Sequence, residues 1–161
     1  MTELNTSQID DAGLFTAHQA IFGLIFGYSA AVDRGDFTAV GELFRHGEYI
    51  VNNGAVSLPG TAIGQRFEQV LRRYEDGTPQ TMHVNPNVVV KIDPGANTAT
   101  ARTPVQVFQE IDGDIRCIYA GHYDDSFERR ADGWVFRSRS AIASLLGDMS
   151  HHLLNDERPV R

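Results

Sequence analysis

Three polar side chains alternate along the first half of residues 81–92, which read TMHVNPNVVVKI. The second half, with three consecutive valines and an isoleucine, is typical of a β-strand. Residues two apart in an extended chain face the same side, so His83, Asn85 and Asn87 would form one polar row. An imidazole can act as a general base near neutral pH, and the amides can bind a hydroxyl or carbonyl oxygen. The row therefore indicates the wall of a polar cavity or a solvent-exposed face, and the two asparagines could equally cap the start of the strand.

Tyrosine and arginine side chains could assist such a base. Tyr28 lies on the apolar face of an expected helix, where it could donate to a substrate oxygen or be an ordinary core tyrosine. Tyr49, in an expected hairpin, is a candidate for the same role. Arg139 could stabilise an anionic leaving group, or pair with an acid of the preceding strand, Asp125 or Asp124. Arg137 is expected on the same face of its strand as Arg139.

The sequence has no further motif for a metal, a nucleotide or a covalent nucleophile. His122 and Asp124 alternate on one expected strand, but no third ligand follows at a suitable spacing. His151 and His152 lie in a polar segment, where a pair of histidines is usually solvated. No glycine-rich phosphate loop and no serine or cysteine nucleophile motif is present. We therefore expect no metal and no cofactor.

The hydrophobic pattern predicts helices first and long strands afterwards. Asp10 or Asp11 can cap an N-terminal helix whose apolar residues recur at three- and four-residue steps, and Gly35 can end it in the left-handed conformation. Asp36 can cap a second, short helix. The expected helices are residues 12–33, 37–44 and 61–74, and the expected strands are residues 48–51, 55–58, 82–92, 97–109, 114–129 and 134–144.

This order of elements predicts an α+β fold, with a cone-shaped curved antiparallel sheet wrapped around the N-terminal helix and three helices closing one side. Gly121, inside a long strand, can provide the bend. A cone of this kind leaves an opening that suits a small molecule. We expect a single domain over residues 1–161 with an ordered core of about 12–153, and a tail from residue 150 that is partly ordered at best.

Composition restricts the class of protein and its partners. With 42% hydrophobic and 22% charged residues, the chain is typical of a soluble globular domain. Its net charge of −7 argues against binding to a nucleic-acid backbone. The lone Cys117 excludes an internal disulfide and suits a reducing compartment. The N-terminus is polar and acidic, unlike a signal peptide, and the longest apolar run, about residues 17–32, is interrupted and too short to span a bilayer. We expect a cytoplasmic protein without a membrane partner.

Apolar residues of the expected long strands also predict self-association. The outer face of the curved sheet would expose apolar residues in a monomer, for example among Val105, Val107, Ile118 and Ala120. We therefore expect a homo-oligomer formed through that face, a dimer or a trimer.

Several short motifs, in their order and spacing, resemble the SnoaL-like branch of the nuclear transport factor 2-like superfamily. The resemblance covers about residues 12–153 and implies the cone-shaped fold, homo-oligomers, and a small hydrophobic or polycyclic aromatic substrate. The motifs are residues 28–36 (YSAAVDRGD), Leu43-Phe44, Thr81-x-His83, Gly121-x-Tyr123-x-Asp125-x-Phe127 and Gly133-Trp134-x-Phe136-x-x-Arg139.

Within this branch the sequence is similar to scytalone dehydratase and hexachlorocyclohexane dehydrochlorinase. The resemblance implies that Asp33, from the end of the first helix, orients His83 and raises its basicity, and that Arg139 helps to receive the leaving group. Tyr28 stands where the dehydrochlorinase has a lysine, which favours a neutral oxygen substrate over chloride elimination. An acid at a helix C-terminus is unfavourable by up to about 1 kcal/mol, so Asp33 either bonds the ring of His83 or belongs to a local turn with Gly35.

The first hypothesis is a cofactor-independent lyase of the dehydratase type. His83 would take a proton from an activated carbon, Asp33 would orient it, and Tyr28 or Arg139 would assist the departure of water. The second hypothesis is an isomerase or a polyketide cyclase that uses the same two residues. The third is a ligand-binding module without catalysis, or one similar to the small subunit of an oxygenase.

Overall fold

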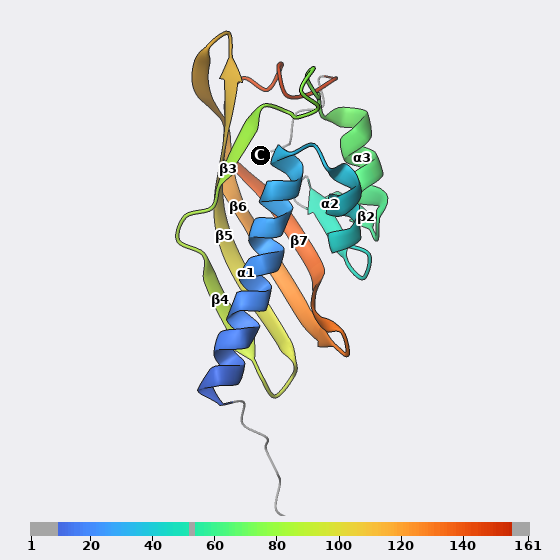
Figure 1. The fold of residues 1–161 in the computed structure, drawn as a ribbon, viewed down its shortest axis with the longest axis vertical. Helices are drawn as coiled ribbons and strands as arrows, with labels where there is room; N and C mark the ends of the chain where they lie inside the picture. The colour runs from blue at the N-terminus through green and yellow to red at the C-terminus, as the bar shows by residue number, and fades with distance from the viewer. Residues whose placement is uncertain (1–9, 52–53, 156–161) are drawn as a thin grey trace, which may run out of the picture.

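The computed structural model describes residues 10–51 and 54–155, so the expected leader before residue 10 and the tail beyond residue 155 lie outside the described residues. The described residues form three helices and seven strands, which confirms the expected α+β class (Figure 1). The elements are α1 (Asp11–Asp33), α2 (Phe37–Leu43), β1 (Glu48–Val51), β2 (Val56–Pro59), α3 (Ala62–Val70), β3 (Thr81–Val84), β4 (Val89–Asp93), β5 (Thr98–Ile111), β6 (Asp114–Arg130) and β7 (Gly133–Leu146).

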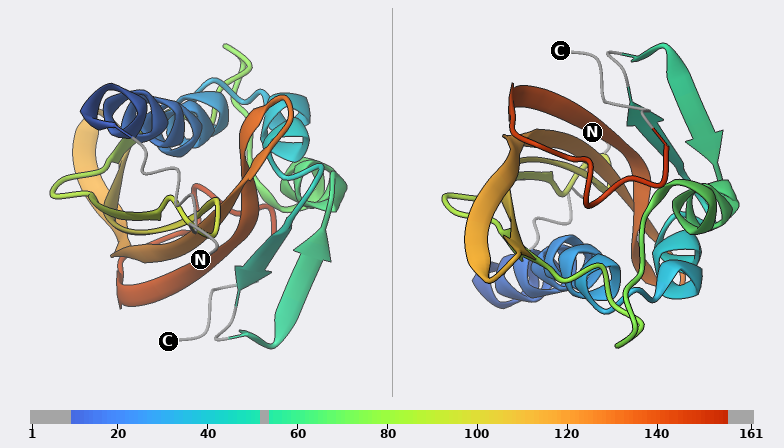
Figure 2. Two further views of the ribbon diagram at one scale, coloured as in Figure 1. Left: turned by 90° about the horizontal axis from the view of Figure 1, so that it is seen from below. Right: turned by 90° about the horizontal axis from the view of Figure 1, so that it is seen from above.

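The described strands form one curved sheet that does not close into a barrel. Its order is β2-β1-β7-β6-β5-β3. Strand β4 also pairs with β5, along residues 98–102, whereas β3 pairs along residues 106–109. Helix α1 lies along the concave side, and α2 and α3 lie beside its C-terminal end (Figure 2). All neighbouring strands are antiparallel, as expected, except β1 and β7, which are parallel, so the sheet is mixed at this one pair. Strand β1 follows α2 in the chain and is not joined to β7 by a hairpin, so a hairpin turn does not force the two strands to run in opposite directions.

Helix α1 has the ends that the sequence predicts. The Asp10 carboxylate accepts a hydrogen bond from the Gly13 N–H at 2.8 Å. Gly35 follows the helix with a φ of 70°, and its N–H donates to the Val32 carbonyl. A Cβ at Gly35 would lie 2.4 Å from the Gly77 carbonyl oxygen, so only glycine fits there. This sharp end fixes the direction in which the side chain of Asp33 leaves the helix.

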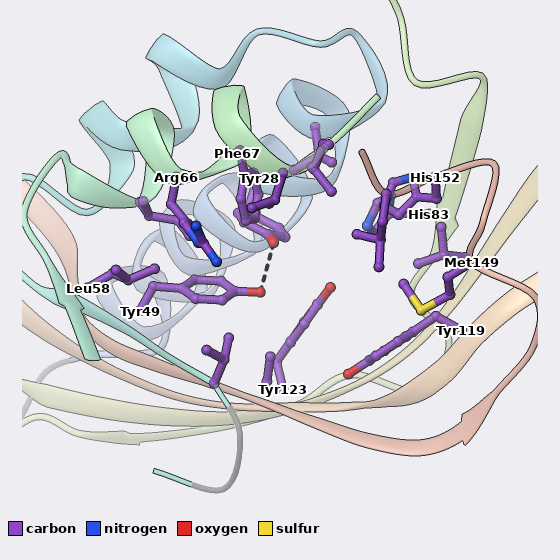
Figure 3. A pocket seen from close by; sticks show the side chains of 18 of the residues that line it. Tyr28, Tyr49, Leu58, Arg66, Phe67, His83, Tyr119, Tyr123, Met149 and His152 are labelled. Atoms are coloured by element: carbon purple, nitrogen blue, oxygen red, sulfur yellow. Dashed lines mark hydrogen bonds between the residues drawn. The ribbon is translucent and has the colours of Figure 1, made fainter. Parts of the chain in front are cut away.

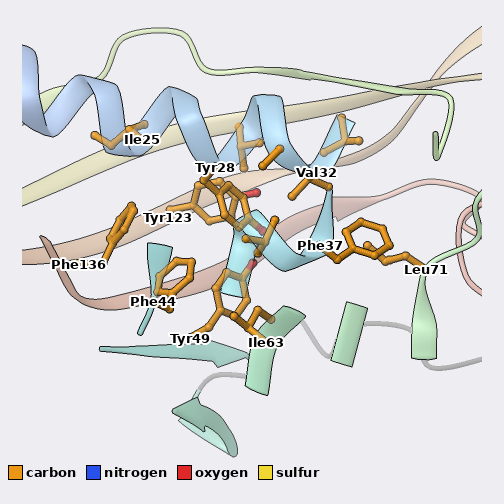
Figure 4. Packing of buried hydrophobic residues seen from close by; sticks show 14 of the residues in the cluster. Ile25, Tyr28, Val32, Phe37, Phe44, Tyr49, Ile63, Leu71, Tyr123 and Phe136 are labelled. Atoms are coloured by element: carbon orange, nitrogen blue, oxygen red, sulfur yellow. Dashed lines mark hydrogen bonds between the residues drawn. The ribbon is translucent and has the colours of Figure 1, made fainter. Parts of the chain in front are cut away.

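By length and composition alone, α1 could cross a membrane. It has 23 residues, and an 18-residue window has a mean hydropathy of 1.2, so the shortness of the apolar run at residues 17–32 does not exclude a span. In the structure, one face of α1 packs into the core, where Ile21, Ile25 and Tyr28 are at most 2% exposed (Figure 4). Core helices of soluble proteins have the same composition, and here the core accounts for the apolar face.

The third helix is shorter than expected. It ends at Val70 rather than at about residue 74, and Leu71 has extended backbone angles. Leu71 forms an isolated β-bridge with Leu153, and the Arg72 N–H donates to the His152 carbonyl at 2.8 Å. Backbone bonds with the segment after β7 therefore replace the last helical turn. The expected loose tail is correspondingly ordered as far as the described residues reach.

The expected strand at residues 82–92 is two strands. β3 and β4 both pair with β5, but they are separated by a break in which Asn87 has a φ of 53°. Pro86 has no N–H for a sheet, and asparagine tolerates the left-handed conformation, so this segment turns rather than pairs. The polar row predicted at His83, Asn85 and Asn87 therefore does not continue along one strand face.

Irregular pairing also moves side chains to unexpected faces. Val105, Val107 and Ile118 are at most 5% exposed and belong to the core, so their expected place on the outer face is wrong, and Ala120 is half-buried. Val105 and Val107 face inward because the odd-numbered side chains of β5 point to the core rather than to the outer face. Ile118 faces inward because the pairing of β5 with β6 shifts between Val107 and Phe108, which leaves Ile118 as the extra residue of a bulge.

A second bulge separates Arg137 from Arg139. The register of β6 and β7 shifts between Ser126 and Phe127, so that Phe136 and Arg139 are both buried while Arg137 is exposed. The expected common face of the two arginines is therefore wrong. Large apolar side chains are still exposed on the strands, among them Met82, Ile115 and Leu145, and the homo-oligomer stays a prediction.

Candidate active site

A cavity of about 480 Å³ lies between the concave side of the sheet, α3 and the segment after β7 (Figure 3). Its wall is mostly apolar and aromatic, with a small set of polar side chains, as expected for a small-molecule site. The polar and aromatic lining residues are Tyr28, Tyr49, Arg66, Phe67, His83, Tyr119, Tyr123 and His152; the aliphatic ones are Val32, Val51, Val56, Leu58, Ile63, Val70, Leu71, Val107, Ile118, Ala141, Met149 and Leu153.

Asp33 and His83 come together where the end of α1 meets the start of β3. The Nδ1 of His83 lies 2.6 Å from Asp33 Oδ1. The Thr81 hydroxyl donates to the same oxygen at 2.9 Å, and the His83 backbone N–H donates to Asp33 Oδ2 at 2.8 Å. The carboxylate therefore fixes both the ring of His83 and the strand that carries it. The alternative local turn at Asp33 is not what its side chain forms.

The charge of Asp33 decides the tautomer of His83. Burial raises the pKa of this carboxyl, but the hydrogen bonds and charge of His83, with the Thr81 hydroxyl, outweigh burial and lower it below its ordinary value. An ionised carboxylate only accepts hydrogen bonds, so Nδ1 of His83 carries the hydrogen. His83 lines the cavity, and its Nε2 makes no hydrogen bond with the described residues. This nitrogen is the basic atom available to a ligand.

Tyrosine hydroxyls gather in the middle of the cavity. Tyr28 and Tyr49 share a hydrogen bond of 3.0 Å between their hydroxyl oxygens. The Tyr28 ring meets the His83 ring edge to face, with 6.4 Å between centroids. Burial raises the pKa of Tyr28, Tyr49 and Tyr123, so all three keep their protons and can donate hydrogen bonds. All three tyrosines line the same cavity as His83.

Arg139 is not part of the cavity wall. Its guanidinium is fully buried and donates two hydrogen bonds to Asp125, at 2.7 and 2.8 Å. It also lies over the rings of Tyr28 and Tyr123, at 4.4 and 4.2 Å from their centroids. Burial lowers the pKa of Arg139, but the Asp125 carboxylate outweighs this and keeps it raised. Of the two roles considered, the geometry fits the ion pair, and the guanidinium packs against the rings of the two tyrosines.

Asn85 and Asn87 also lie outside the cavity wall. Asn85 Oδ1 accepts a hydrogen bond from the Ser29 hydroxyl at 2.7 Å, and its amide donates to the Pro104 carbonyl at 3.4 Å. It therefore ties α1 to the sheet. Asn87 is exposed in the break between β3 and β4. Of the seven predicted site residues, the structure brings Asp33, His83, Tyr28 and Tyr49 together and leaves the other three aside.

Four polar lining residues were not predicted as site residues from the sequence: Arg66, Tyr119, Tyr123 and His152. His152 was expected to be solvated, yet it is only 7% exposed. The one sequence signal is that Met149 and Leu153, which flank it, are apolar residues in a polar segment. Within residues 10–51 and 54–155, no three His, Cys, Asp or Glu side chains are grouped to hold a metal ion.

Known structures share this fold at low sequence identity. An NTF2-like protein with a cystatin-like fold from Novosphingobium aromaticivorans is 24% identical, with a TM-score of 0.67 over 84% of this chain and 90% of that one. A scytalone dehydratase candidate from the same organism is 18% identical, with a TM-score of 0.65 over 84% and 89%. A hexachlorocyclohexane dehydrochlorinase from Novosphingobium barchaimii is 14% identical, with a TM-score of 0.68 over 94% and 99%.

The curated proteins provide no match to this sequence. The family comparison does, because residues 15–140 match the SnoaL-like domain. The matched range includes α1 from residue 15 onward, the whole of β3 and residues 133–140 of β7, and with them both Asp33 and His83. The chain therefore belongs to the SnoaL-like domain family.

Proposed function

We propose that the protein is a cofactor-independent lyase of the dehydratase type, which removes water or a similar leaving group from a small hydrophobic substrate. The observation that carries this proposal is the contact of 2.6 Å between His83 Nδ1 and Asp33, on an imidazole that lines a cavity. A base held in one tautomer, with its free nitrogen directed to an apolar pocket, suits proton removal from carbon. Similar folds in a scytalone dehydratase candidate and a dehydrochlorinase support the same reaction class.

The proposed reaction is a β-elimination. His83 Nε2 takes a proton from a carbon next to a carbonyl group, and the electrons of that C–H bond form the new C=C bond. The C–O bond at the next carbon breaks, and its electrons leave with the oxygen. The His83 imidazolium returns its proton to this oxygen, which departs as water. Asp33 stays ionised and stabilises the imidazolium while it exists.

The tyrosine pair supplies the second part of the proposed chemistry. Negative charge develops on the carbonyl oxygen when the carbon loses its proton. In the hydrogen bond between Tyr28 and Tyr49 one hydroxyl donates and the other keeps a free hydrogen, which it can donate to that oxygen. Because both keep their protons, they act as hydrogen-bond donors rather than as bases. Arg139 is assigned no contact with the leaving group in this scheme.

An isomerase or polyketide cyclase would share the first step. Donors to a developing enolate, such as Tyr28 and Tyr49, serve isomerisation and ring closure as well as elimination. The difference is the fate of the enolate, which product analysis distinguishes. A module without catalysis is less well supported, because His83 lines the cavity instead of facing away from it.

The test is turnover of a panel of cyclic β-hydroxy ketones, followed by the ultraviolet absorbance of the conjugated product. We expect the wild-type protein to convert at least one of them, and His83→Ala to lose about 10²- to 10⁴-fold in rate, the usual contribution of a general base. His46→Ala is the matched control, because His46 is exposed and lies outside the cavity. Full elimination activity in His83→Ala, with the fold intact by circular dichroism, would refute the mechanism.

A further inference from the structure

The cavity contains a second imidazole that the proposed mechanism does not use. His152 lies on the segment of residues 147–155 that follows β7, and this segment crosses the upper end of the cone toward α3 (Figure 2). Met149, His152 and Leu153 all line the cavity. Figure 3 shows His152 at the same end of the cavity as His83, with the tyrosine hydroxyls farther along. His152 is therefore a wall residue at the same end of the cavity as His83.

Backbone bonds, rather than its own side chain, set the position of His152. The segment is tied on both sides of this residue to the end of α3 and to the loop after it. The bonds are Arg72 N–H to His152 O at 2.8 Å, Leu154 N–H to Val70 O at 2.8 Å, and Tyr74 hydroxyl to His151 O at 2.7 Å. The ring is thus held at the cavity although it makes no side-chain hydrogen bond with the described residues.

One ring nitrogen of His152 lacks a hydrogen-bond partner among the described residues. Its Nδ1 is buried, and no described residue donates to it or accepts from it. Polar atoms that are buried in proteins are nearly always hydrogen-bonded, and one without a partner costs folding free energy. A buried polar atom without a partner therefore needs an explanation, and one explanation is a ligand that forms the missing hydrogen bond. A plain structural role would be served equally well by an apolar ring at this position.

The charge state of His152 restricts what the ring can do. Burial, followed by the positive charge that His83 can carry, lowers the pKa of His152 to about 4, with Asp33 acting weakly in the opposite direction. At neutral pH the ring has one N–H donor and one nitrogen acceptor. A neutral imidazole matches a hydroxyl group, which also donates and accepts, better than it matches a carboxylate. It is not a second base that competes with His83 for a proton.

We propose that His152 is a substrate-binding residue that hydrogen-bonds a hydroxyl group of the substrate at the His83 end of the cavity. This step rests on the proposed function, in which that hydroxyl is the group that leaves as water. The inferred substrate class is an apolar ring compound with a hydroxyl at one end, near the two histidines, and a carbonyl oxygen toward Tyr28 and Tyr49. His152 positions the leaving oxygen, and His83 performs the proton transfers.

A matched pair of ligands isolates this hydrogen bond. Naphthalene and 2-naphthol have the same apolar rings and differ by one hydroxyl, and both are small enough for a cavity of about 480 Å³. The dissociation constants of both are measured by fluorescence for the wild-type protein, His152→Phe and His151→Ala. The ratio of the naphthalene to the 2-naphthol constant reports the hydroxyl contact and cancels general effects on the cavity.

We expect His152→Phe to lower this ratio about 3- to 10-fold, the usual contribution of one hydrogen bond between neutral groups. His152→Gln, which keeps a donor and an acceptor, should retain more of the ratio than His152→Phe. His151→Ala should leave it unchanged, because the hydrogen bonds described for His151 use its backbone carbonyl. If His152→Phe does not fold, His152→Leu replaces it.

Two outcomes would overturn the proposal. One is an unchanged ratio in a folded His152→Phe protein. The other is a ratio that falls in Tyr49→Phe but not in His152→Phe, which would place the hydroxyl at the tyrosines. Because the measurement needs no turnover, it is independent of the test of the base. If the ratio depends on His152 while the β-hydroxy ketones are not converted, the lyase proposal fails and the hydroxyl site remains.

Discussion

Two pairs of an acid and a nitrogen base lie in this protein at different depths. The carboxylate of Asp33 contacts His83 at 2.6 Å, and that of Asp125 contacts Arg139 at 2.7 Å. The first pair borders the cavity, with side chains 22% and 6% exposed, whereas both side chains of the second pair are fully buried. Similar contacts therefore lie in different surroundings, because His83 of the first pair lines the cavity and Arg139 of the second packs against the rings of Tyr28, Tyr123 and Phe136.

The two pairs are connected through Tyr28. Its ring lies under the Arg139 guanidinium on one side and meets the His83 ring on the other. The buried pair thus supports a tyrosine, and the tyrosine faces the base. We infer that the deep pair contributes to stability and to the position of Tyr28, and that the pair at the cavity contributes to chemistry. The following predictions test that division.

The largest effect is expected for the deep pair. Arg139→Met leaves the Asp125 carboxylate buried without its cation, which should lower the free energy of unfolding by about 3–5 kcal/mol. The combined variant Asp125→Leu/Arg139→Met should be less destabilised than the sum of the two single changes, because no charge is left unpaired. Urea denaturation of all three variants provides the measurement. Single variants as stable as the wild type would contradict the structural role.

Asp33→Asn should separate stability from activity. The amide can still accept hydrogen bonds on one oxygen, so we expect the free energy of unfolding to fall by only about 1–2 kcal/mol. The turnover rate should fall by about 10²-fold or more, because an amide N–H directed at His83 favours the tautomer in which Nε2 carries the hydrogen. Denaturation and steady-state kinetics on the same preparation test this. Full activity would remove Asp33 from the mechanism.

Acid should destabilise the protein in two separate ranges. His152 has an ordinary pKa of 6.5 and a folded pKa of about 4, so the unfolded chain binds more protons between these values. Its contribution is fully present above pH 6.5 and is lost as the pH falls toward 4, by up to about 3 kcal/mol at ~1.4 kcal/mol per pKa unit. Asp33, whose pKa is lowered from 3.8, adds a loss only below about pH 4.

Substitutions of His152 and Asp33 test which residue causes the loss of stability in each pH range. His152→Phe should flatten the fall in unfolding free energy between pH 6.5 and pH 4, and Asp33→Asn should flatten the part below that. The measurement is a series of urea titrations across this pH range, with His151→Ala as the control. An unchanged slope between pH 6.5 and pH 4 in His152→Phe would contradict the buried, neutral state of the ring.

The smallest effect on the free energy of unfolding is expected for the hydrogen bond between Tyr28 and Tyr49. Tyr49→Phe leaves the buried Tyr28 hydroxyl without the partner it has at 3.0 Å, which should cost about 1 kcal/mol of unfolding free energy. Tyr28→Phe/Tyr49→Phe should cost less than the sum of the single changes, because both ends of the bond are removed. Additive costs, measured by thermal or urea denaturation, would indicate that the hydroxyls have other partners.

Local patterns in the sequence predicted most of the framework. The start and end of α1, the short α2 and the three long strands follow from caps, glycines and alternation, which act over a few residues. The family resemblance added the pairing of Asp33 with His83, which a pattern of residues 50 positions apart could not decide by itself. Tyr28 and Tyr49 were identified because a tyrosine among apolar residues needs a partner for its hydroxyl.

The remaining errors have common physical causes. One extra residue in a strand reverses the faces of all that follow, so the bulges at Ile118 and Arg137 could not be located from alternation alone. The break at Asn87 interrupts the predicted polar row, so that His83 lies on β3 and Asn85 and Asn87 lie between β3 and β4. His152 was missed because its burial depends on backbone bonds to Arg72 and Val70, about 80 residues earlier in the chain, and no local pattern records such a contact.

The segment of residues 147–155 lines the cavity with side chains that take no part in the hydrogen bonds between this segment and the end of α3. Main-chain atoms fasten it to the end of α3, while Met149, His152 and Leu153 project inward. Substitutions at these three positions are therefore expected to change which molecules fit the cavity while keeping the contact between Asp33 on α1 and His83 on β3. For protein engineering, this stretch is the natural place to randomise first.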